Sequence, residues 1–400
     1  MTPNTSMLVR CAIGCLLGLM GCQPAEQIEP GNGTIVGAAP AVAVRNGHAV
    51  VTWHRSGIRV SSYDGSGWSA PQLIAPEGTY PDVAVSDSGG AIVVFGSGLG
   101  LQARVYATSR WSPLFTLDSI SNPTYAVGVE GAGRATVVWS AGGQVRVSHQ
   151  EGGGWLGTLL SASAAVGRPQ IAVNGSGVAF AAWCDAGGTI WGSRRVPPNS
   201  WEASSGSTSA CCQAPLLDQP GPAISVGVSS SGEAVIVGGT TMRVCEKRYV
   251  PGSGWQATTV LNASGPDSTA PQLAVAPDGH ALVAWNNYFT GGALIRARAY
   301  VPGSGWGAVL TGPAAGHGLL GVGIGSSGSG AIVYRSSTGV SDVIYDAASG
   351  ILSAPSVVYS QSGAYLLRVG FDPSQPGQGV STWQQAVSSN EAIWAARLGL

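Results

Sequence analysis

Short apolar runs of about five to eight residues recur along the chain, separated by turns rich in Gly, Asn and Asp. The clearest run is GHAVVTW, from Gly47 to Trp53, which returns almost unchanged as GHALVAW, from Gly279 to Trp285. Runs this short, rich in Val, Ile and aromatic residues and bounded by turns, predict β-strands rather than helices. The pattern therefore predicts an all-β protein.

The heptapeptide belongs to a repeat that occurs eight times. Each copy starts with Gly, and seven of the eight copies have an aromatic residue six positions later. These glycines are Gly47, Gly89, Gly133, Gly177, Gly232, Gly279, Gly328 and Gly377. Their spacing of about 42 to 55 residues is typical of supersecondary units that stack against their neighbours.

Each repeat contains four predicted strands. A run such as PAVAV at residue 40 precedes the glycine, and the heptapeptide follows as the second strand. An alternating third run comes next, such as IRVSSY at residue 58, and the fourth begins at a Gly-Trp step, as in GSGWSAPQLI. The turns between the first two strands contain Asn, Asp and Gly, which accept a positive φ at little cost. Four antiparallel strands per repeat predict the blade of a propeller.

The fourth strand is missing from the last repeat, whereas the β-like segment at 31–39, GNGTIVGAA, has no partner in its own repeat. We expect this N-terminal segment to complete the last blade and so remove the exposed edges of an open ring. The predicted fold is an eight-bladed β-propeller of four-stranded antiparallel blades, with a seven-bladed propeller as the alternative. The blades are expected to begin near residues 40, 81, 125, 169, 222, 271, 320 and 367.

The second strand of each repeat is apolar on both faces, as a sheet packed between two others requires. In the first repeat we expect Ala49, Val51 and Trp53 to face one neighbouring blade and Val50 to face the other. Burial of each aromatic side chain contributes about 1.5 to 3 kcal/mol. The repeated heptapeptide therefore indicates core packing rather than two active sites.

Composition excludes several classes of protein. With 61 Gly, 24 Pro and only 10% charged residues, helices are not expected as the main element. The net charge is −1 and no basic cluster is present, so nothing in the sequence would attract nucleic acid. No cofactor or metal motif is found outside the repeat, and we expect a monomeric propeller with neither.

Residues 1–21 predict a lipoprotein signal peptide. The apolar run from Cys11 to Met20 is about ten residues long, too short for a bilayer-spanning helix. It ends in Leu-Met-Gly-Cys22, which resembles a bacterial lipobox. The resemblance implies cleavage before Cys22, acyl chains on Cys22 as a membrane anchor, a linker at 22–30 and the propeller at 31–400. Gln23 implies sorting to the outer membrane of a Gram-negative envelope, facing the periplasm or the cell surface. An ordinary secretory signal is the alternative.

The A-x-V-x-W and GW-x-x-P patterns over residues 40–400 resemble secreted bacterial propellers of the sialidase-like superfamily and the blade repeats of propeller lectins. A sialidase would need a convergent arginine triad and Asp boxes. The nearest segment to an Asp box, Ser62–Trp68, has Ser66 in place of Gly and its Trp one position early. The candidate arginines all hold one repeat position and would not converge: Arg59, Arg146, Arg243 and Arg296.

Four cysteines cluster in the fourth and fifth repeats: Cys184, Cys211, Cys212 and Cys245. In an oxidising compartment such a cluster favours disulfides over a metal site, and the spacing fits no zinc motif. Three pairings are possible, including a bond between the two adjacent cysteines. We expect one of the adjacent pair to join Cys184 and the other to join Cys245.

Ligand binding is predicted for the face around the central channel that carries both the connections between blades and the loops between second and third strands, and the candidates are taken from these loops. Their aromatic and amide side chains suit contact with a glycan or peptide. The candidate residues are His54, Asp185, Asn286, Asn287, Tyr288, Phe289 and Gln384.

No catalytic set stands outside the repeat, except that Asp185 with Asp218 or Glu391 could form an acid pair. We therefore expect a non-catalytic, membrane-anchored extracytoplasmic lipoprotein that binds protein or envelope polymer. A glycan-binding lectin is the first alternative, and a divergent sialidase-like glycoside hydrolase is the second.

Overall fold

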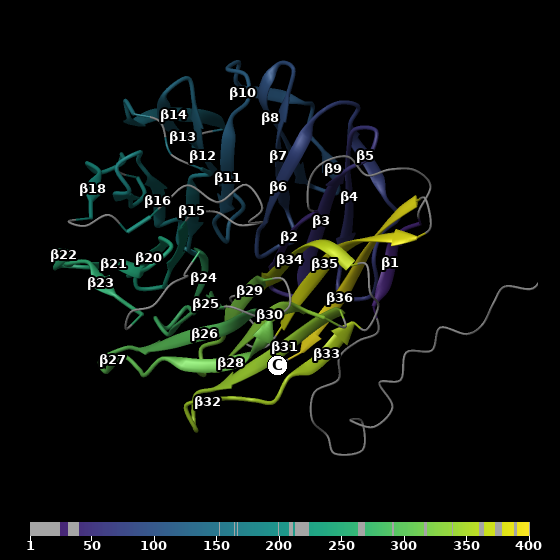
Figure 1. The fold of residues 1–400 in the computed structure, drawn as a ribbon. Coiled ribbons are helices and arrows are strands. Elements are labelled where there is room, and N and C mark those ends of the chain that lie inside the picture. Colours follow the sequence, from purple (N-terminus) through teal and green to yellow (C-terminus); the bar gives the residue numbers. More distant parts are fainter. Residues whose placement is uncertain are drawn as a thin grey trace, which may run out of the picture.

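A computed structural model describes residues 25–30, 40–151, 153–163, 165, 167–198, 200–207, 211–212, 224–262, 269–289, 292–315, 318–337, 339–359, 364–372, 378–387 and 390–399. In these ranges the chain forms eight antiparallel sheets arranged in a ring (Figure 1). The predicted eight-bladed β-propeller is thus confirmed, and the seven-bladed alternative is wrong.

The first four blades follow one another along the chain. Blade 1 contains β2 (Ala41–Arg45), β3 (His48–His54), β4 (Ile58–Tyr63) and β5 (Gln72–Ala75). Blade 2 contains β6 (Thr79–Val85), β7 (Ala91–Ser97), β8 (Gly100–Ala107), β9 (Arg110–Trp111) and β10 (Phe115–Asp118). Blade 3 contains β11 (Thr124–Val129), β12 (Ala135–Ala141), β13 (Gln144–Glu151) and β14 (Gly154–Ser161). Blade 4 contains β15 (Gln170–Val173), β16 (Ala179–Cys184), β17 (Ile190–Arg195) and β18 (Ser205–Gly206).

The other four blades complete the ring. Blade 5 contains β19 (Ile224–Val228), β20 (Ala234–Gly239), β21 (Val244–Val250), β22 (Gly254–Trp255) and β23 (Thr259–Val260). Blade 6 contains β24 (Thr269–Val275), β25 (Ala281–Phe289), β26 (Gly292–Val301), β27 (Gly305–Trp306) and β28 (Leu310–Ala315). Blade 7 contains β29 (Leu319–Ile324), β30 (Gly330–Ser336), β31 (Gly339–Asp346), β32 (Ile351–Leu352) and β33 (Ser356–Tyr359). Blade 8 contains β34 (Ala364–Phe371), β35 (Gln378–Val387), β36 (Asn390–Gly399) and the N-terminal β1 (Glu26–Glu29).

An N-terminal strand closes the ring, but it lies earlier in the chain than predicted. β1 pairs antiparallel with β36, with Gln27 opposite Trp394. This strand falls within the predicted linker at 22–30, and the predicted closing segment at 31–39 lies outside the described residues. The short sequence EQIE has little apolar character, so its strand was not visible in the hydrophobic pattern. Ile28 and Glu29 are nevertheless buried.

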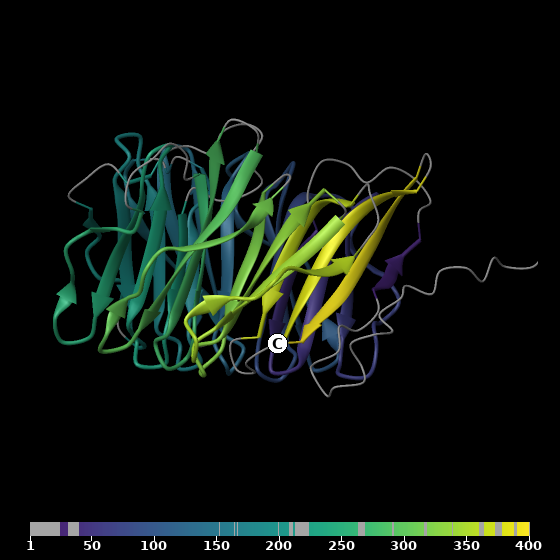
Figure 2. The same cartoon turned by 60° about the horizontal axis from the view of Figure 1, so that its bottom comes forward.

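The core consists of side chains packed between neighbouring blades, which stand side by side in Figure 2. Along β3, alternate side chains point to opposite neighbours, as predicted. Ala49, Val51 and Trp53 pack with Val380, Ile393 and Ala395 of blade 8. Val50 instead packs with Val83 and Val85 of blade 2.

The first strand of each blade lies next to the first strands of both neighbouring blades, and these eight strands surround the axis of the ring. Glycine allows some of them to approach closely. A Cβ atom on Gly227 of β19 would lie 2.5 Å from Cγ2 of Val275 in β24. A Cβ atom on Gly128 of β11 would lie 2.7 Å from Cγ2 of Val173 in β15.

Two disulfide bonds link blades 4 and 5 through two cysteines of the segment between them. They connect Cys184 with Cys212 and Cys211 with Cys245, across Cα–Cα distances of 6.1 and 5.6 Å. The expected pairing, in which each adjacent cysteine bonds one distant cysteine, is confirmed.

The described part of the chain contains no helix with the length and apolar character needed to cross a membrane. Cys22 and the predicted signal peptide at 1–21 lie outside the described residues.

Candidate functional site

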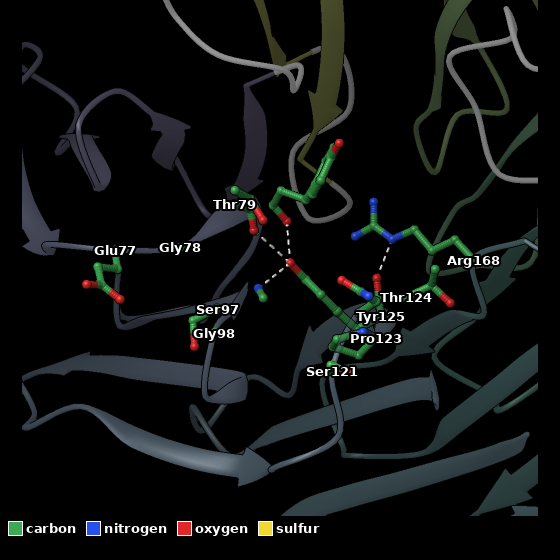
Figure 3. A pocket seen from close by; sticks show the side chains of 13 residues that line it. Glu77, Gly78, Thr79, Ser97, Gly98, Ser121, Pro123, Thr124, Tyr125 and Arg168 are labelled. Atoms are coloured by element: carbon green, nitrogen blue, oxygen red, sulfur yellow. Dashed lines mark hydrogen bonds between the residues drawn. The ribbon is translucent and has the colours of Figure 1, made fainter. Parts of the chain in front are cut away.

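A cavity of about 750 Å³ opens at one end of the propeller, where blade 2, the start of blade 3 and the segment before blade 4 meet (Figure 3). We call this end the loop face, because there second strands connect to third strands and each blade connects to the next. The cavity is lined by the segments at 77–80 and 121–125, by the β7–β8 turn at 96–98, and by Arg168 just before β15. The loop face is the one predicted to carry ligand contacts.

Tyr80 is an aromatic residue in a strained backbone conformation at this cavity. Its φ is +52°, and 63% of the residue is exposed to solvent. It lies in an irregular stretch of the β6–β7 ladder, between the Thr79–Gly96 and Asp82–Val94 pairs. A positive φ is uncommon for a bulky residue and persists only where surrounding structure holds it. Asn122, which also lines the cavity, has a φ of +53°.

The buried hydroxyl of Tyr125 holds the Tyr80 backbone in place. The Tyr125 Oη atom accepts a hydrogen bond from the Gly96 amide at 2.7 Å and donates one to the Tyr80 carbonyl at 2.6 Å (Figure 3). Burial raises the pKa of Tyr125 above its usual value, so the hydroxyl stays protonated at neutral pH. One side chain from blade 3 therefore joins two segments of blade 2 that line the cavity.

Arg168 connects blade 4 to the same cluster. Its Nε donates to the Tyr125 carbonyl, and its Nη2 lies 2.5 Å from Oδ2 of Asp82. Asp82 also accepts a hydrogen bond from the Val127 amide at 3.1 Å. The Arg168 guanidinium is 6.0 Å from the centre of the Tyr125 ring. Side chains from blades 2, 3 and 4 thus fix one another beside the cavity.

This arrangement can bind a polar molecule that also has an apolar face. An exposed aromatic ring offers a stacking surface, while hydroxyl, amide and guanidinium groups offer hydrogen bonds. The polar side chains that line the cavity are Glu77, Thr79, Ser97, Ser121, Asn122, Thr124 and Arg168. Across the described ranges, no group of three His, Cys, Asp or Glu residues could hold a metal ion.

The four predicted ligand residues of blade 6 are part of a strand and do not form a loop. β25 extends to Phe289 and stays paired with β26 up to the Phe289–Gly292 pair. Asn286 is 3% exposed, so its side chain is buried within the blade. Asn287 and Tyr288 lie in the same ladder, and the side chains of Tyr288 and Phe289 lie outside the described part. Polar side chains at a strand end resemble a loop in sequence, although the backbone continues to pair.

Gln384 and His54 also belong to strands. Gln384 is 1% exposed in β35, opposite Ile393 of β36. His54 ends β3 and pairs with Ile58. Neither residue lines the 750 Å³ cavity, and Asp185, Asn286 and Asn287 do not line it either.

Asp185 holds the turn between β16 and β17. Its Oδ1 accepts hydrogen bonds from the amides of Gly187 and Thr189, both at 2.9 Å, and its Oδ2 accepts one from Trp191 Nε1 at 2.8 Å. Burial alone would raise the pKa of Asp185, but these hydrogen bonds outweigh it and lower the pKa. Of its proposed acid partners, Asp218 and the side chain of Glu391 lie outside the described residues.

Sequence reasoning missed the residues that line the cavity, although a signal was present. Tyr80 is the second residue of the first strand of blade 2, in APEGTYPDVAV, and Asn122 and Arg168 lie just before the first strands of blades 3 and 4, in SNPTYAVGV and GRPQIAV. Connections between blades lie on the loop face. Aromatic or charged residues near the beginning of a first strand are therefore candidates for ligand binding. The ligand residues predicted from the sequence all belong to predicted connections within blades.

No protein-family model matches the sequence. A search of curated proteins finds no match either. Among solved structures, the WD40 domain of SCAP from fission yeast is similar at 9% identity, with 94% of each chain covered and a TM-score of 0.56. A lectin from Burkholderia pseudomallei is similar at 12% identity, covering 82% of this chain and all of its own, with a TM-score of 0.53. A fungal alcohol oxidase in complex with copper is similar at 13% identity, covering 95% of this chain and 76% of its own, with a TM-score of 0.50. At these identities the likenesses show a shared β-propeller fold and nothing about activity.

Proposed function

We propose that this propeller binds carbohydrate in the cavity on its loop face. The observation that carries the proposal is Tyr80, an exposed aromatic residue held at a φ of +52° beside hydroxyl, amide and guanidinium groups. A sugar ring presents C–H groups on its faces and hydroxyl groups around its edge. The Tyr80 ring suits the first, and the polar side chains around it suit the second.

The contacts that hold the Tyr80 backbone indicate a preformed binding site. The Tyr125 hydroxyl and the Arg168–Asp82 ion pair fix the cavity wall from three blades. A wall that is already ordered loses little conformational entropy on binding, which leaves more of the contact energy as affinity. The fold is compatible with this use, since one structural neighbour is a lectin.

We further infer that the propeller works at the cell envelope, held by acyl chains on Cys22. The Leu-Met-Gly-Cys22 motif after a short apolar run supports this inference. An envelope location would present the loop face to polysaccharides of the envelope or its surroundings. Mass spectrometry of the mature N-terminal peptide should find acylated Cys22. A mature N-terminus at another residue, or a Cys22 without acyl chains, would contradict the proposed lipid anchor. Neither result would bear on the proposed carbohydrate binding.

A glycan array followed by calorimetry tests the binding function. Tyr80→Ala should weaken the affinity for the glycan found on the array by at least about tenfold, because the stacking surface is lost. Ile351→Ala is the matched control, since Ile351 is also an exposed apolar residue but lies in β32, away from the cavity. The proposal fails if no glycan binds, or if Tyr80→Ala binds as tightly as the unmodified protein.

A further inference from the structure

We propose a second carbohydrate site, for one neutral sugar ring, in the seam between blades 2 and 3. A cavity of about 390 Å³ lies there, lined by Phe115–Asp118 of β10, Trp139 of β12, and parts of β13 and β14. Its volume is at the lower end of the range for small-molecule sites. It shares no lining residue with the loop-face cavity.

Three chemically different side chains line this seam cavity. Oδ2 of Asp118 accepts a hydrogen bond from Trp139 Nε1 at 2.7 Å, and Oδ1 accepts one from the Ile120 amide at 3.1 Å, which together fix the carboxylate between the two blades. Arg146 lies opposite Trp139 in the β12–β13 ladder. The guanidinium of Arg146 points to Oε1 of Gln144, with Nε at 2.9 Å and Nη2 at 2.6 Å. The seam therefore combines an anchored carboxylate, an indole and a guanidinium.

The same trio occurs at the seam where the ring closes, between blades 8 and 1. There Oε2 of Glu29 accepts from Trp53 Nε1 at 2.6 Å, and Arg59 lies opposite Trp53 in the β3–β4 ladder. A second arginine, Arg55, contacts the Glu29 carboxylate at 3.0 Å, and the side chains of both are more than nine-tenths buried. Both the hydrogen bond from Trp53 and the ion pair with Arg55 thus occupy the Glu29 carboxylate at this seam.

One difference in sequence opens the seam between blades 2 and 3. The residue two positions after the tryptophan is Arg55 in blade 1 and Ala141 in blade 3. Alanine brings no charge and little volume, and within the described residues no ion pair involves Asp118. Asp118 is therefore an anchored hydrogen-bond acceptor beside a cavity, whereas Glu29 neutralises a buried arginine.

An apolar wall completes the seam cavity. The rings of Phe115 and Trp155 lie with centres 5.5 Å apart and an interplanar angle of 39°. Leu159, also in the lining, is 51% exposed. Such a wall can receive the C–H face of a sugar ring while Asp118 accepts from its hydroxyl groups and Arg146 donates to its oxygens. One negative and one positive group leave the site without net charge, which favours a neutral sugar over an acidic one.

The seam between blades 3 and 4 is built differently. Trp191 occupies the place opposite the strand tryptophan, where Arg146 stands in blade 3, and its ring stacks on Trp183 at 6.5 Å. That seam therefore lacks the guanidinium and fills its space with a second indole. The proposal accordingly expects one such site at blades 2 and 3, and not one in every seam.

Calorimetric titration with the methyl glycosides of glucose, galactose, mannose and fucose tests the second site. We expect at least one of them to bind with a stoichiometry of one at this site. Trp155→Ala and Asp118→Asn should each weaken that binding by at least about tenfold. The asparagine oxygen can still accept the Trp139 hydrogen bond, but the hydrogen bond from the Ile120 amide is lost. Circular dichroism and urea unfolding of Asp118→Asn therefore accompany the titration, and Trp155→Ala tests the site without this change.

The matched control is Trp111→Ala, because Trp111 pairs with the third strand of blade 2 as Trp155 does in blade 3 but lies outside the seam cavity. Trp111→Ala should leave monosaccharide binding within about twofold of the unmodified protein. No saturable binding up to about 20 mM, or equal affinity in the Trp155→Ala and Asp118→Asn variants, would overturn the proposal. If only Tyr80→Ala loses monosaccharide binding, the sugar binds at the loop face. In that case the seam site is wrong, while the proposed carbohydrate binding at the loop face still holds.

Discussion

The carboxylate of Glu29 lies 2.6 Å from the indole nitrogen of Trp53, so the strand that closes the ring is hydrogen-bonded to the core of the first blade. The same carboxylate contacts Arg55 at 3.0 Å, and both charged side chains are buried. Ring closure therefore depends on a buried ion pair as well as on backbone pairing between β1 and β36.

Removing the Glu29 carboxylate should destabilise the closed ring. Glu29→Ala leaves the Arg55 charge buried without this partner, and such a loss typically costs about 3 to 5 kcal/mol. Urea unfolding followed by tryptophan fluorescence measures the change. Glu26→Ala, at an exposed position of the same strand, is the control and should change the free energy of unfolding by less than about 0.5 kcal/mol. Equal effects of the two substitutions would contradict this role of Glu29.

A methyl group at Gly227 should also destabilise the propeller, for a steric reason. The added Cβ would lie 2.5 Å from Cγ2 of Val275, so β19 and β24 would have to move apart. We expect Gly227→Ala to lower the free energy of unfolding by about 1 to 3 kcal/mol. Gly67→Ala, where no heavy atom lies within 4 Å of the added Cβ, serves as the control. If both variants unfold at the same urea concentration, close packing of the first strands does not limit stability.

The blade pattern could be predicted because each blade repeats one local rule. The alternation of Ala49, Val50 and Val51 between two neighbouring blades is visible in the sequence, since successive strand residues point to opposite faces. Strand β1 was missed because EQIE is mostly polar and gains its burial from partners elsewhere in the chain, such as Arg55. A hydrophobic pattern cannot reveal a charge that is buried by pairing.

The site was harder to predict than the fold. Asn286 and Gln384 read as loop residues, although long-range pairing keeps both in strands. The role of Tyr80 depends on the Tyr125 hydroxyl, 45 positions later, which donates a hydrogen bond to the Tyr80 carbonyl and accepts one from the Gly96 amide. Such contacts between blades have no local signature beyond the position of the residues just before a first strand.

Protonation of His149 should make stability fall as the solution becomes acidic. Burial, followed by the charge of Arg195, lowers the pKa of His149 below its ordinary value of 6.5. As the pH falls below about 6.5 the unfolded chain binds a proton at this residue that the folded chain does not, so the free energy of unfolding decreases until the folded-state pKa is reached.

Replacing His149 tests this linkage directly. His149→Gln should show a smaller loss of stability between about pH 7.5 and 5.5 than the unmodified protein, as measured by urea unfolding at each pH. The measurements near pH 7.5 show the cost of the substitution itself, because little histidine is protonated there. If His149→Gln loses as much unfolding free energy between these two pH values as the unmodified protein, another group governs the acid sensitivity.

The Tyr125 hydroxyl should act on ligand affinity through Tyr80. Tyr125→Phe removes the hydrogen bonds to the Tyr80 carbonyl and the Gly96 amide, so the cavity wall loses its support. We expect an affinity loss of at least about tenfold for the loop-face glycan, but no further loss when Tyr125→Phe is combined with Tyr80→Ala. Tyr334→Phe, which removes a buried hydroxyl group from blade 7, should leave affinity unchanged. Additive losses in the double variant would show that Tyr125 does not act by positioning Tyr80.

A crystal structure of the protein with a bound oligosaccharide from the glycan array tests carbohydrate binding at the loop face most directly. We predict a sugar ring stacked on the exposed face of Tyr80, with hydrogen bonds to side chains that line the 750 Å³ cavity. An oligosaccharide bound elsewhere on the propeller, with the loop-face cavity empty, would contradict the account.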